Sequence, residues 1–278
     1  MKRRRFLKST LYSSAVALVG FYPLFIERHK VLVNRYQVPI ADLPRSFDGF
    51  TLAHLTDIHL GSFVSKSFVE EIVHNTNALR PDAIVCTGDY VLSNDTTEAI
   101  DSVWRIMSNL KAKYGVYSVL GNHDHHVDFS RSLYWLERSG QDIRHKCKAI
   151  YKGKERIIIG GSGDYWSDRL DIDKAFSCSD ERDCRLLLSH NPDAIDTQFD
   201  TPISLVMSGH THGGQVVIPF FGPPILPVKN KKYSSGLITT AKTKLFISKG
   251  VGCSGLPVRF NCYPEIAVLE LVNPRLTV

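Results

Sequence analysis

The chain has 278 residues, 43% of them hydrophobic and 22% charged, which indicates a globular protein of one large or two small domains. Its formal net charge is +6, and this charge is unevenly distributed. Five basic residues lie near the N-terminus: Lys2, Arg3, Arg4, Arg5 and Lys8. The rest of the chain has 29 basic and 28 acidic residues. A nearly neutral domain offers little surface for neutralising phosphates, which argues against a nucleic-acid partner.

The first 29 residues have the pattern of an export or anchor segment. A basic start is followed by an apolar run from Leu11 to Ile26, which is short for a spanning helix and suits a signal sequence or a plain anchor. Residues 3–8 are similar to the twin-arginine export signal, although Lys2 stands where Ser or Thr is usual. The A-x-A-like site at residues 15–17 lies inside the apolar run, so we expect an uncleaved, membrane-associated form.

This pattern sets two expectations, one for domain organisation and one for location. Residues 1–29 are predicted to be a twin-arginine-like signal or membrane anchor, and residues 30–278 the folded domain. By the positive-inside rule the basic N-terminus stays in the cytoplasm, so the domain is expected in the periplasm or on the outer face of the inner membrane. The alternative is association with the cytoplasmic face.

The first strands of this domain are predicted at residues 31–40 and 51–56. The second of them runs directly into Asp57-Ile58-His59. Because side chains two positions apart on an extended chain face the same side, Asp57 and His59 can reach one ion together. His54 has the opposite parity and is expected to be a packed or surface residue.

Next the chain alternates between helices and strands. Helical spacing predicts a helix over 65–79, with His74 on its surface, and another over 96–110. The continuous apolar run 83–87 predicts a strand buried on both faces that ends in Gly88-Asp89. The run 116–120 ends in Gly121-Asn122-His123-Asp124. Each strand of this β-α-β-α-β pattern therefore carries a potential ligand at its C-terminal end.

The second half of the chain also places candidate ligands at the ends of predicted strands. A helix is predicted at 130–138, and strands at 156–161, 185–189, 204–208, 245–249 and 266–271. His190 follows the strand at 185–189, and Gly209-His210-Thr211-His212 follows the strand at 204–208. His125 and His126 are expected to be exposed or to lie behind the ligands.

A long loop rich in Gly and Pro spans residues 213–236. We expect it either to pack on its own domain or to form a wall for an apolar part of a substrate or a membrane.

The six cysteines form no CxxC pair. Cys86 lies in an apolar run and is expected to be a buried thiol. Outside the cytosol, Cys178 with Cys184 or Cys253 with Cys262 are possible disulfides, but spacing does not decide the pairing.

The candidate ligands share a position at strand ends and combine carboxylate, amide and imidazole groups: Asp57, His59, Asp89, Asn122, His190, His210 and His212. Mixed oxygen and nitrogen donors suit Mn, Fe, Co, Ni or Zn rather than a calcium cage or a thiolate site. Seven ligands are enough for two divalent ions if Asp89 bridges them. Such a pair activates a water for phosphoryl transfer. His123 would then serve as proton donor, held by Asp124.

In this order the blocks Asp-x-His, Gly-Asp, Gly-Asn-His-Asp, a lone His and Gly-His-x-His resemble the calcineurin-like metallophosphoesterases over roughly residues 50–215. Blocks at 189–193, 209–215 and 259–265 are similar to bacterial phosphoesterases of the YaeI/YkuE type. The resemblance implies a four-layer αββα sandwich of two mixed sheets. It also implies two metal sites that share Asp89, one with Asp57, His59 and His212 and the other with Asn122, His190 and His210.

The expected function is a metal-dependent phosphodiesterase, with manganese as the first candidate metal. The apolar loop 216–228 and the basic cluster 229–232 keep open a pyrophosphatase for a lipid-linked nucleotide such as UDP-2,3-diacylglucosamine. A non-catalytic binding scaffold is less favoured because every ligand position is filled. The oligomeric state and the natural substrate stay open.

Overall fold

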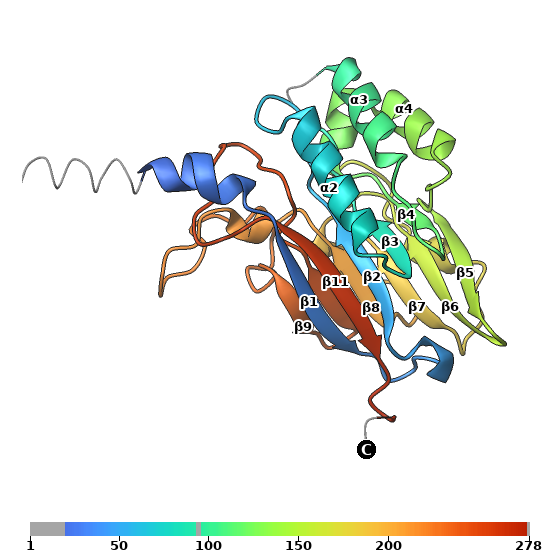
Figure 1. Cartoon of the computed structure of the whole chain (residues 1–278). Coiled ribbons are helices and arrows are strands. Elements are labelled where there is room, and N and C mark those ends of the chain that lie inside the picture. The colour runs from blue at the N-terminus through green and yellow to red at the C-terminus, as the bar shows by residue number, and fades with distance from the viewer. Residues whose placement is uncertain (1–19, 93–95, 277–278) are drawn as a thin grey trace, which may run out of the picture.

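Two mixed β-sheets pack face to face and enclose the main hydrophobic core (Figure 1). The computed structural model describes residues 20–92 and 96–276. The two mixed sheets with their helices confirm the predicted α/β fold class, and the layer outside the second sheet consists of short 3-10 turns.

The first sheet has the order β1-β11-β2-β3-β4, and only the β11–β2 pair within it is antiparallel. Because β2, β3 and β4 run parallel, their C-terminal ends meet at one edge of the sheet. These strands match the predicted runs, and their bounds are β1 (Leu32–Pro39), β2 (Phe50–Leu55), β3 (Ala83–Cys86), β4 (Val116–Ser118) and β11 (Glu265–Val272).

The second sheet has the order β5-β6-β7-β8-β10-β9. Its inner strands run parallel, and an antiparallel strand closes each edge. The bounds are β5 (Lys146–Lys152), β6 (Glu155–Gly161), β7 (Cys184–Leu188), β8 (Leu205–Ser208), β9 (Gly236–Thr239) and β10 (Lys244–Ile247). Sequence analysis missed β5 and β9. Both are edge strands with partly exposed side chains, and edge strands are often lysine-rich, as β5 is.

Three helices cover the outer face of the first sheet (Figure 1): α2 (Lys66–Ala78), α3 (Thr97–Met107) and α4 (Asn122–Arg138). Ser65 caps α2 by accepting a hydrogen bond from the Phe68 amide. Two of the helices were predicted, and the helix predicted at 130–138 is the second half of α4. That helix begins already at Asn122 and kinks at Asp128, whose backbone is extended.

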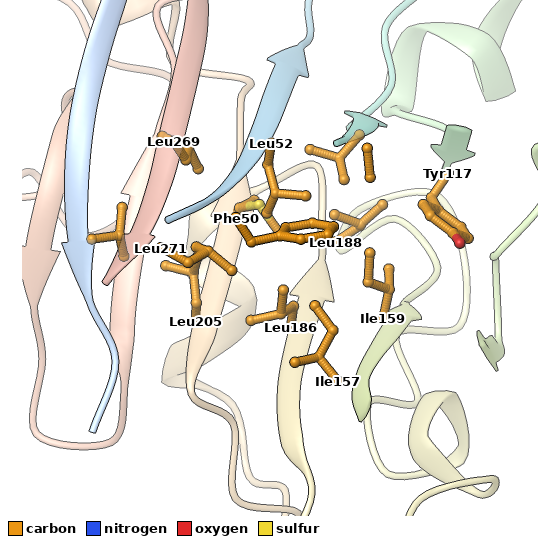
Figure 2. Packing of buried hydrophobic residues seen from close by; sticks show 14 of the residues in the cluster. Phe50, Leu52, Tyr117, Ile157, Ile159, Leu186, Leu188, Leu205, Leu269 and Leu271 are labelled. Atoms are coloured by element: carbon orange, nitrogen blue, oxygen red, sulfur yellow. The ribbon is translucent and has the colours of Figure 1, made fainter. Parts of the chain in front are cut away.

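The outer face of the second sheet is covered by short 3-10 turns rather than long helices. They are η4 (Lys174–Phe176) and η5 (Pro192–Asp196), and they pack on the apolar residues of β7, β8 and β10. Between the two sheets lie side chains such as Phe50, Leu52 and Leu188 (Figure 2). Strands β3, β7 and β8 are buried along their whole length, which explains why their sequences are apolar apart from Arg185 and Ser208.

The disulfide of the structure joins Cys147 of β5 to Cys178, so neither pairing suggested by the sequence is found. Cys184 is a free thiol in the core between the sheets, whereas Cys178 is exposed. Cys253 and Cys262 are buried free thiols as well. Cys86 is the buried thiol that was predicted.

Residues 20–31 lead into β1 through a π-helical turn, η1 (Tyr22–Ile26), and a 3-10 turn, η2 (Glu27–His29). Most of the predicted signal or anchor falls on residues 1–19, outside the described residues. Among the helices that the structure describes, none is both long and apolar enough to span a bilayer.

Candidate metal centre

The C-terminal ends of strands from both sheets converge on one buried site. Seven predicted ligands follow β2, β3, β4, β7 and β8, and each is at most 5% exposed: Asp57, His59, Asp89, Asn122, His190, His210 and His212. The structure therefore brings together the whole set that sequence analysis proposed. Burying so many ionisable groups is unfavourable unless they are paired or bind a metal.

Five of these ligands have an unusual backbone. Asp57, His59, Asp89, His210 and His212 have φ angles from 50° to 69°, in the left-handed region that side chains other than glycine seldom adopt. Such strain gathers at functional sites, where the surrounding structure enforces it. Here it turns consecutive strand ends sharply enough to place their side chains at a common centre.

Two glycines make room for the ligands. A Cβ atom on Gly121 would lie 2.2 Å from Oδ1 of Asp89. On Gly209 it would lie 2.1 Å from Oγ1 of Thr56 and 2.3 Å from Oδ2 of Asp57. The glycines of the Gly-Asn-His-Asp and Gly-His-Thr-His blocks are therefore required by close packing against the ligand loops.

The first cluster consists of Asp57, His59 and His212. Nε2 of His59 lies 3.0 Å from Nε2 of His212, and Nε2 of His212 lies 3.3 Å from Oδ1 of Asp57. Nε2 of His59 is also 3.6 Å from Oδ2 of Asp89. These donor atoms point to one position, as the ligands of a metal ion do.

The second cluster consists of Asp89, His190 and His210. Nε2 of His190 lies 3.2 Å from Oδ2 of Asp89 and 3.2 Å from Nδ1 of His210. Within the described residues, Oδ1 of Asn122 is buried without a hydrogen-bond partner. It can complete this second ligand set. Oδ2 of Asp89 faces both clusters, and its bridging of two ions stays a prediction.

Backbone carbonyls fix the imidazoles of the second cluster. Nδ1 of His190 lies 2.7 Å from the carbonyl oxygen of Thr87, and Nε2 of His210 lies 2.9 Å from that of Pro227. Because a carbonyl oxygen only accepts, these nitrogens carry the hydrogens. The opposite nitrogen of each ring is then free to bind a metal, an arrangement that is usual for metal-ligating histidines.

The electrostatics favour a charged bridging group. Burial opposes ionisation of Asp89, yet the imidazoles of His190 and His123 hold the pKa of its carboxyl well below the ordinary value. Asp57 is fully buried, and its carboxylate accepts hydrogen bonds from the amide of His210 at 2.9 and 3.1 Å. Two carboxylates, an amide oxygen and four imidazoles thus fit a pair of divalent first-row metal ions.

His123 lies at the edge of the two clusters and lines the cavity beside them. Its amide donates to Oδ1 of Asp89 at 2.9 Å, its Nε2 is 3.9 Å from Oδ2 of Asp89, and its ring meets that of His59 edge-on. Burial lowers the pKa of His123 to about 4.

Asp124 accepts hydrogen bonds of 2.9 Å from the amides of Asp89, Tyr90 and Gly121. It therefore ties the loop after β3 to the start of α4. Burial, together with the charge of Asp89, raises the pKa of Asp124 to about 7. Its predicted role in holding the His123 ring stays a prediction.

The remaining predicted histidines lie outside the ligand clusters. His54 is buried and its Nε2 lies 2.8 Å from Oγ1 of Thr87, which confirms a packed residue. His125 stacks on Phe129, and His74 and His126 are exposed.

A cavity of about 480 Å³ opens beside the clusters. One side is formed by the metal-site residues, and the other is mainly apolar, with Val216, Ile225, Leu256 and Val258. The long loop 213–236 is therefore a wall of the cavity. Trp166, whose ring lies 4.4 Å from that of His210, also lines it and was not singled out from the sequence.

Sequence analysis also missed Arg259, which is fully buried behind His212. Its Nη2 donates to the carbonyl oxygens of Gly252 at 2.7 Å and Lys249 at 2.8 Å, and lies 3.5 Å from Nδ1 of His212. It was noted only as part of the block at 259–265. Only the fold brings Arg259 of that block behind the ligand His212.

The family model for calcineurin-like phosphoesterases matches residues 50–214. The chain is 31% identical to the metallophosphoesterase YkuE of Bacillus subtilis, with 98% of both chains aligned. It is 30% identical to the phosphodiesterase YaeI of Escherichia coli, over 98% of this chain and 100% of that one. It is 25% identical to the UDP-2,3-diacylglucosamine pyrophosphatase LpxG of Chlamydia muridarum, over 82% of this chain and 86% of that one.

Among solved structures, a dimetal phosphatase from Danio rerio superposes with a TM-score of 0.44 at 12% identity, over 73% of this chain and 88% of that one.

Proposed function

We propose that this chain, which belongs to the calcineurin-like phosphoesterase family and is a phosphoric ester hydrolase, hydrolyses a phosphodiester at the two ligand clusters. The observation that carries this proposal is the place of Asp89. Its Oδ2 lies 3.2 Å from Nε2 of His190 and 3.6 Å from Nε2 of His59, so one carboxylate serves both clusters.

Asp57, His59 and His212 would hold one ion, and Asn122, His190 and His210 the other, with Asp89 between them. Two divalent ions bound there supply an activated water and neutralise the charge of the phosphate. Manganese is the first candidate, and Fe, Co, Ni and Zn suit the same donors. The chain's own contribution is to fix these donors in advance through strained, buried loops.

His123 would assist the departure of the leaving oxygen. Its ring lines the cavity beside the clusters, where the phosphate of a substrate would bind. Although burial lowers the pKa of His123 to about 4, the negative charge of a bound phosphate would raise it again. The imidazole can then donate its proton to the leaving group.

The cavity supports a diester rather than a small monoester. It extends from the metal-site residues to an apolar wall that includes Ile225 and Leu256, and this leaves room for a substituent on each side of the phosphate. The relative YaeI is named a phosphodiesterase, which supports the same reaction.

A lipid-linked pyrophosphate is the second candidate substrate. The apolar wall formed by Val216, Ile225, Leu256 and Val258 favours it, since acyl chains need such a surface. The relative LpxG is named a UDP-2,3-diacylglucosamine pyrophosphatase. Lys229, whose Nζ bonds to the hydroxyl of Tyr165, lies in the basic cluster after this wall.

Membrane association through residues 1–29, with the domain in the periplasm or on the outer face of the inner membrane, belongs to the same proposal. A topology reporter fused after Val278 tests it. A cytoplasmic signal would contradict export and would favour the lipid-linked pyrophosphatase.

The reaction class is tested with the full chain in detergent, using an aryl phosphodiester and the matching monoester, with Mn²⁺ and after chelation. We expect metal-dependent cleavage of the diester and little of the monoester. If neither is cleaved while two metals per chain are bound, pyrophosphate-linked lipids are tested next. Less than one metal per chain in protein purified without chelator would instead support a binding scaffold.

A further inference from the structure

A hydrogen-bonded turn at residues 218–222 presents apolar side chains to solvent. Phe220 is fully exposed, Phe221 is 86% exposed, and Ile225 just after the turn is 75% exposed. The amide of Ile218 donates to the carbonyl of Gly222 at 3.0 Å, and the amide of Gly222 donates back at 2.9 Å. The aromatic rings are therefore held outward by a hydrogen-bonded turn. Exposed apolar groups of this kind usually mark an interaction site.

A second segment exposes the same kind of side chain. Phe21 and Phe25 are 51% and 58% exposed, and their rings stack at 4.7 Å. This segment is fastened to the domain, because the hydroxyls of Tyr22 and Tyr263 lie 2.6 Å apart and the amide of Arg259 donates to the carbonyl of Pro23 at 3.2 Å. The phenylalanines are thus turned outward from a docked segment.

Leu256 connects the two segments. It is 66% exposed and also lines the cavity, as Ile225 does. Its loop is joined to the turn because the amide of Val217 donates to the carbonyl of Phe260 at 2.9 Å. The N-terminal segment and the loop 213–236 accordingly lie on the same side of the sheets (Figure 1). We call the exposed side chains of this face the apolar rim: Phe21, Phe25, Phe220, Phe221, Ile225 and Leu256.

The charge around the apolar rim is positive. Residues 20–31, 213–236 and 249–264 contain a single acid, Glu27, which is 2% exposed and accepts a hydrogen bond from the amide of Cys262. The same three segments carry six basic residues that reach the surface: Arg28, Lys30, Lys229, Lys231, Lys232 and Lys249. Phenylalanines with basic neighbours are typical of surfaces that bind anionic membranes.

We propose that the apolar rim docks the domain on an anionic lipid bilayer, so that the cavity opens toward the membrane. The sequence before Phe21 supports this occupant, because residues 11–19 are uncharged and mostly apolar. Ile225 and Leu256 belong both to the rim and to the cavity wall, so an amphiphile can pass from the bilayer to the metal centre. This contact is additional to any anchor in residues 1–19 and does not depend on the reaction proposed above.

The experiment places a fluorescent reporter in the rim of the full-length protein. Phe221→Trp is mixed with vesicles of phosphatidylcholine and phosphatidylglycerol, with and without brominated acyl chains. We expect the emission added by the new tryptophan to shift to shorter wavelength and to be quenched by the brominated lipid. The matched control is Tyr151→Trp, at a 58% exposed position of β5 on the far edge of the second sheet, whose emission should not be quenched.

If the protein bound only through residues 1–19, it would still co-sediment with the vesicles, but the Phe221→Trp emission would not be quenched. This result would overturn the proposal. So would a blue shift without lipid that depends on protein concentration, because the rim would then contact a second copy. A Phe220→Ser/Phe221→Ser variant should keep its hydrolysis of a soluble diester, which also shows that it folds. If the brominated lipid quenches the Phe221→Trp emission but the protein hydrolyses no diester, the docking surface is supported and the proposed reaction is rejected.

Discussion

The Nε2 atoms of His59 and His212 lie 3.0 Å apart, although the two residues follow strands of different sheets. Both side chains are buried, since His59 is 0% and His212 is 5% exposed. Two imidazole nitrogens lie this close when one donates a hydrogen bond to the other or when both bind one cation, and Oδ1 of Asp57 adds a negative charge 3.3 Å from His212. The candidate metal centre therefore joins loops that follow strands of both sheets.

Metal removal should lower the stability of the whole domain. Without ions, buried carboxylates and imidazoles lose their partner, and an ion that binds only the folded state stabilises it by about 2.7 kcal/mol at 100 times its dissociation constant. We expect chelation to lower the melting temperature and Mn²⁺ to restore it in proportion to the logarithm of its concentration. Thermal scanning measures this, and an unchanged melting temperature would contradict this stabilisation.

Asp89→Asn should abolish turnover and reduce the bound metal to less than two ions per chain. The substitution preserves the shape of the side chain but removes the charge that both clusters face at 3.2 and 3.6 Å. Metal analysis and diester hydrolysis are measured on the same preparation. The control is Asp101→Asn, which removes a carboxylate paired with Arg131 on the helices and should keep both metals. Full activity of Asp89→Asn would refute the shared-carboxylate arrangement.

His123→Ala should keep two metals and slow hydrolysis by about 10²–10⁴-fold, the usual loss when a general acid is removed. Its ring lines the cavity and groups with His59 and Asp89, but it belongs to neither of the two clusters assigned to the ions. The loss should be smaller for a diester with a nitrophenolate leaving group than for one with an alkoxide, because the former needs no proton. An equal loss for both substrates would remove the assigned role.

The ligands could be predicted from the sequence because of a local rule: parallel strands share an edge, so residues that follow them meet. Asp57, Asp89 and His190 each follow a buried strand that was recognised. The φ angles of 50° to 69° at five ligands carry no local signature, since they are enforced by neighbouring loops. The pairing of Cys147 with Cys178 was missed for a similar reason, because β5 itself was not recognised.

Arg259→Lys should weaken metal binding and lower stability. The guanidinium donates to the carbonyls of Lys249, Gly250 and Gly252 from a fully buried position behind His212, and an ammonium group cannot make these bonds together. Loss of buried hydrogen bonds costs about 1–3 kcal/mol, and loss of an outer support typically weakens metal affinity by about 10–100-fold. Denaturant unfolding and metal titration measure the two effects. Arg131→Lys, at a surface ion pair, is the control and should change neither quantity appreciably.

Gly209→Ala should abolish activity, although it adds only one methyl group. That group would lie 2.1 Å from Oγ1 of Thr56 and 2.3 Å from Oδ2 of Asp57, so the loop carrying His210 and the loop carrying Asp57 must separate. The amide of His210 would then lose its bonds to the Asp57 carboxylate, and the first cluster would lose its geometry. Gly20→Ala, where a Cβ atom meets nothing within 4 Å, is the matched control and should retain full activity. Metal analysis separates the outcomes, because a variant that keeps both metals and full turnover would show that the two loops can part without disturbing the site.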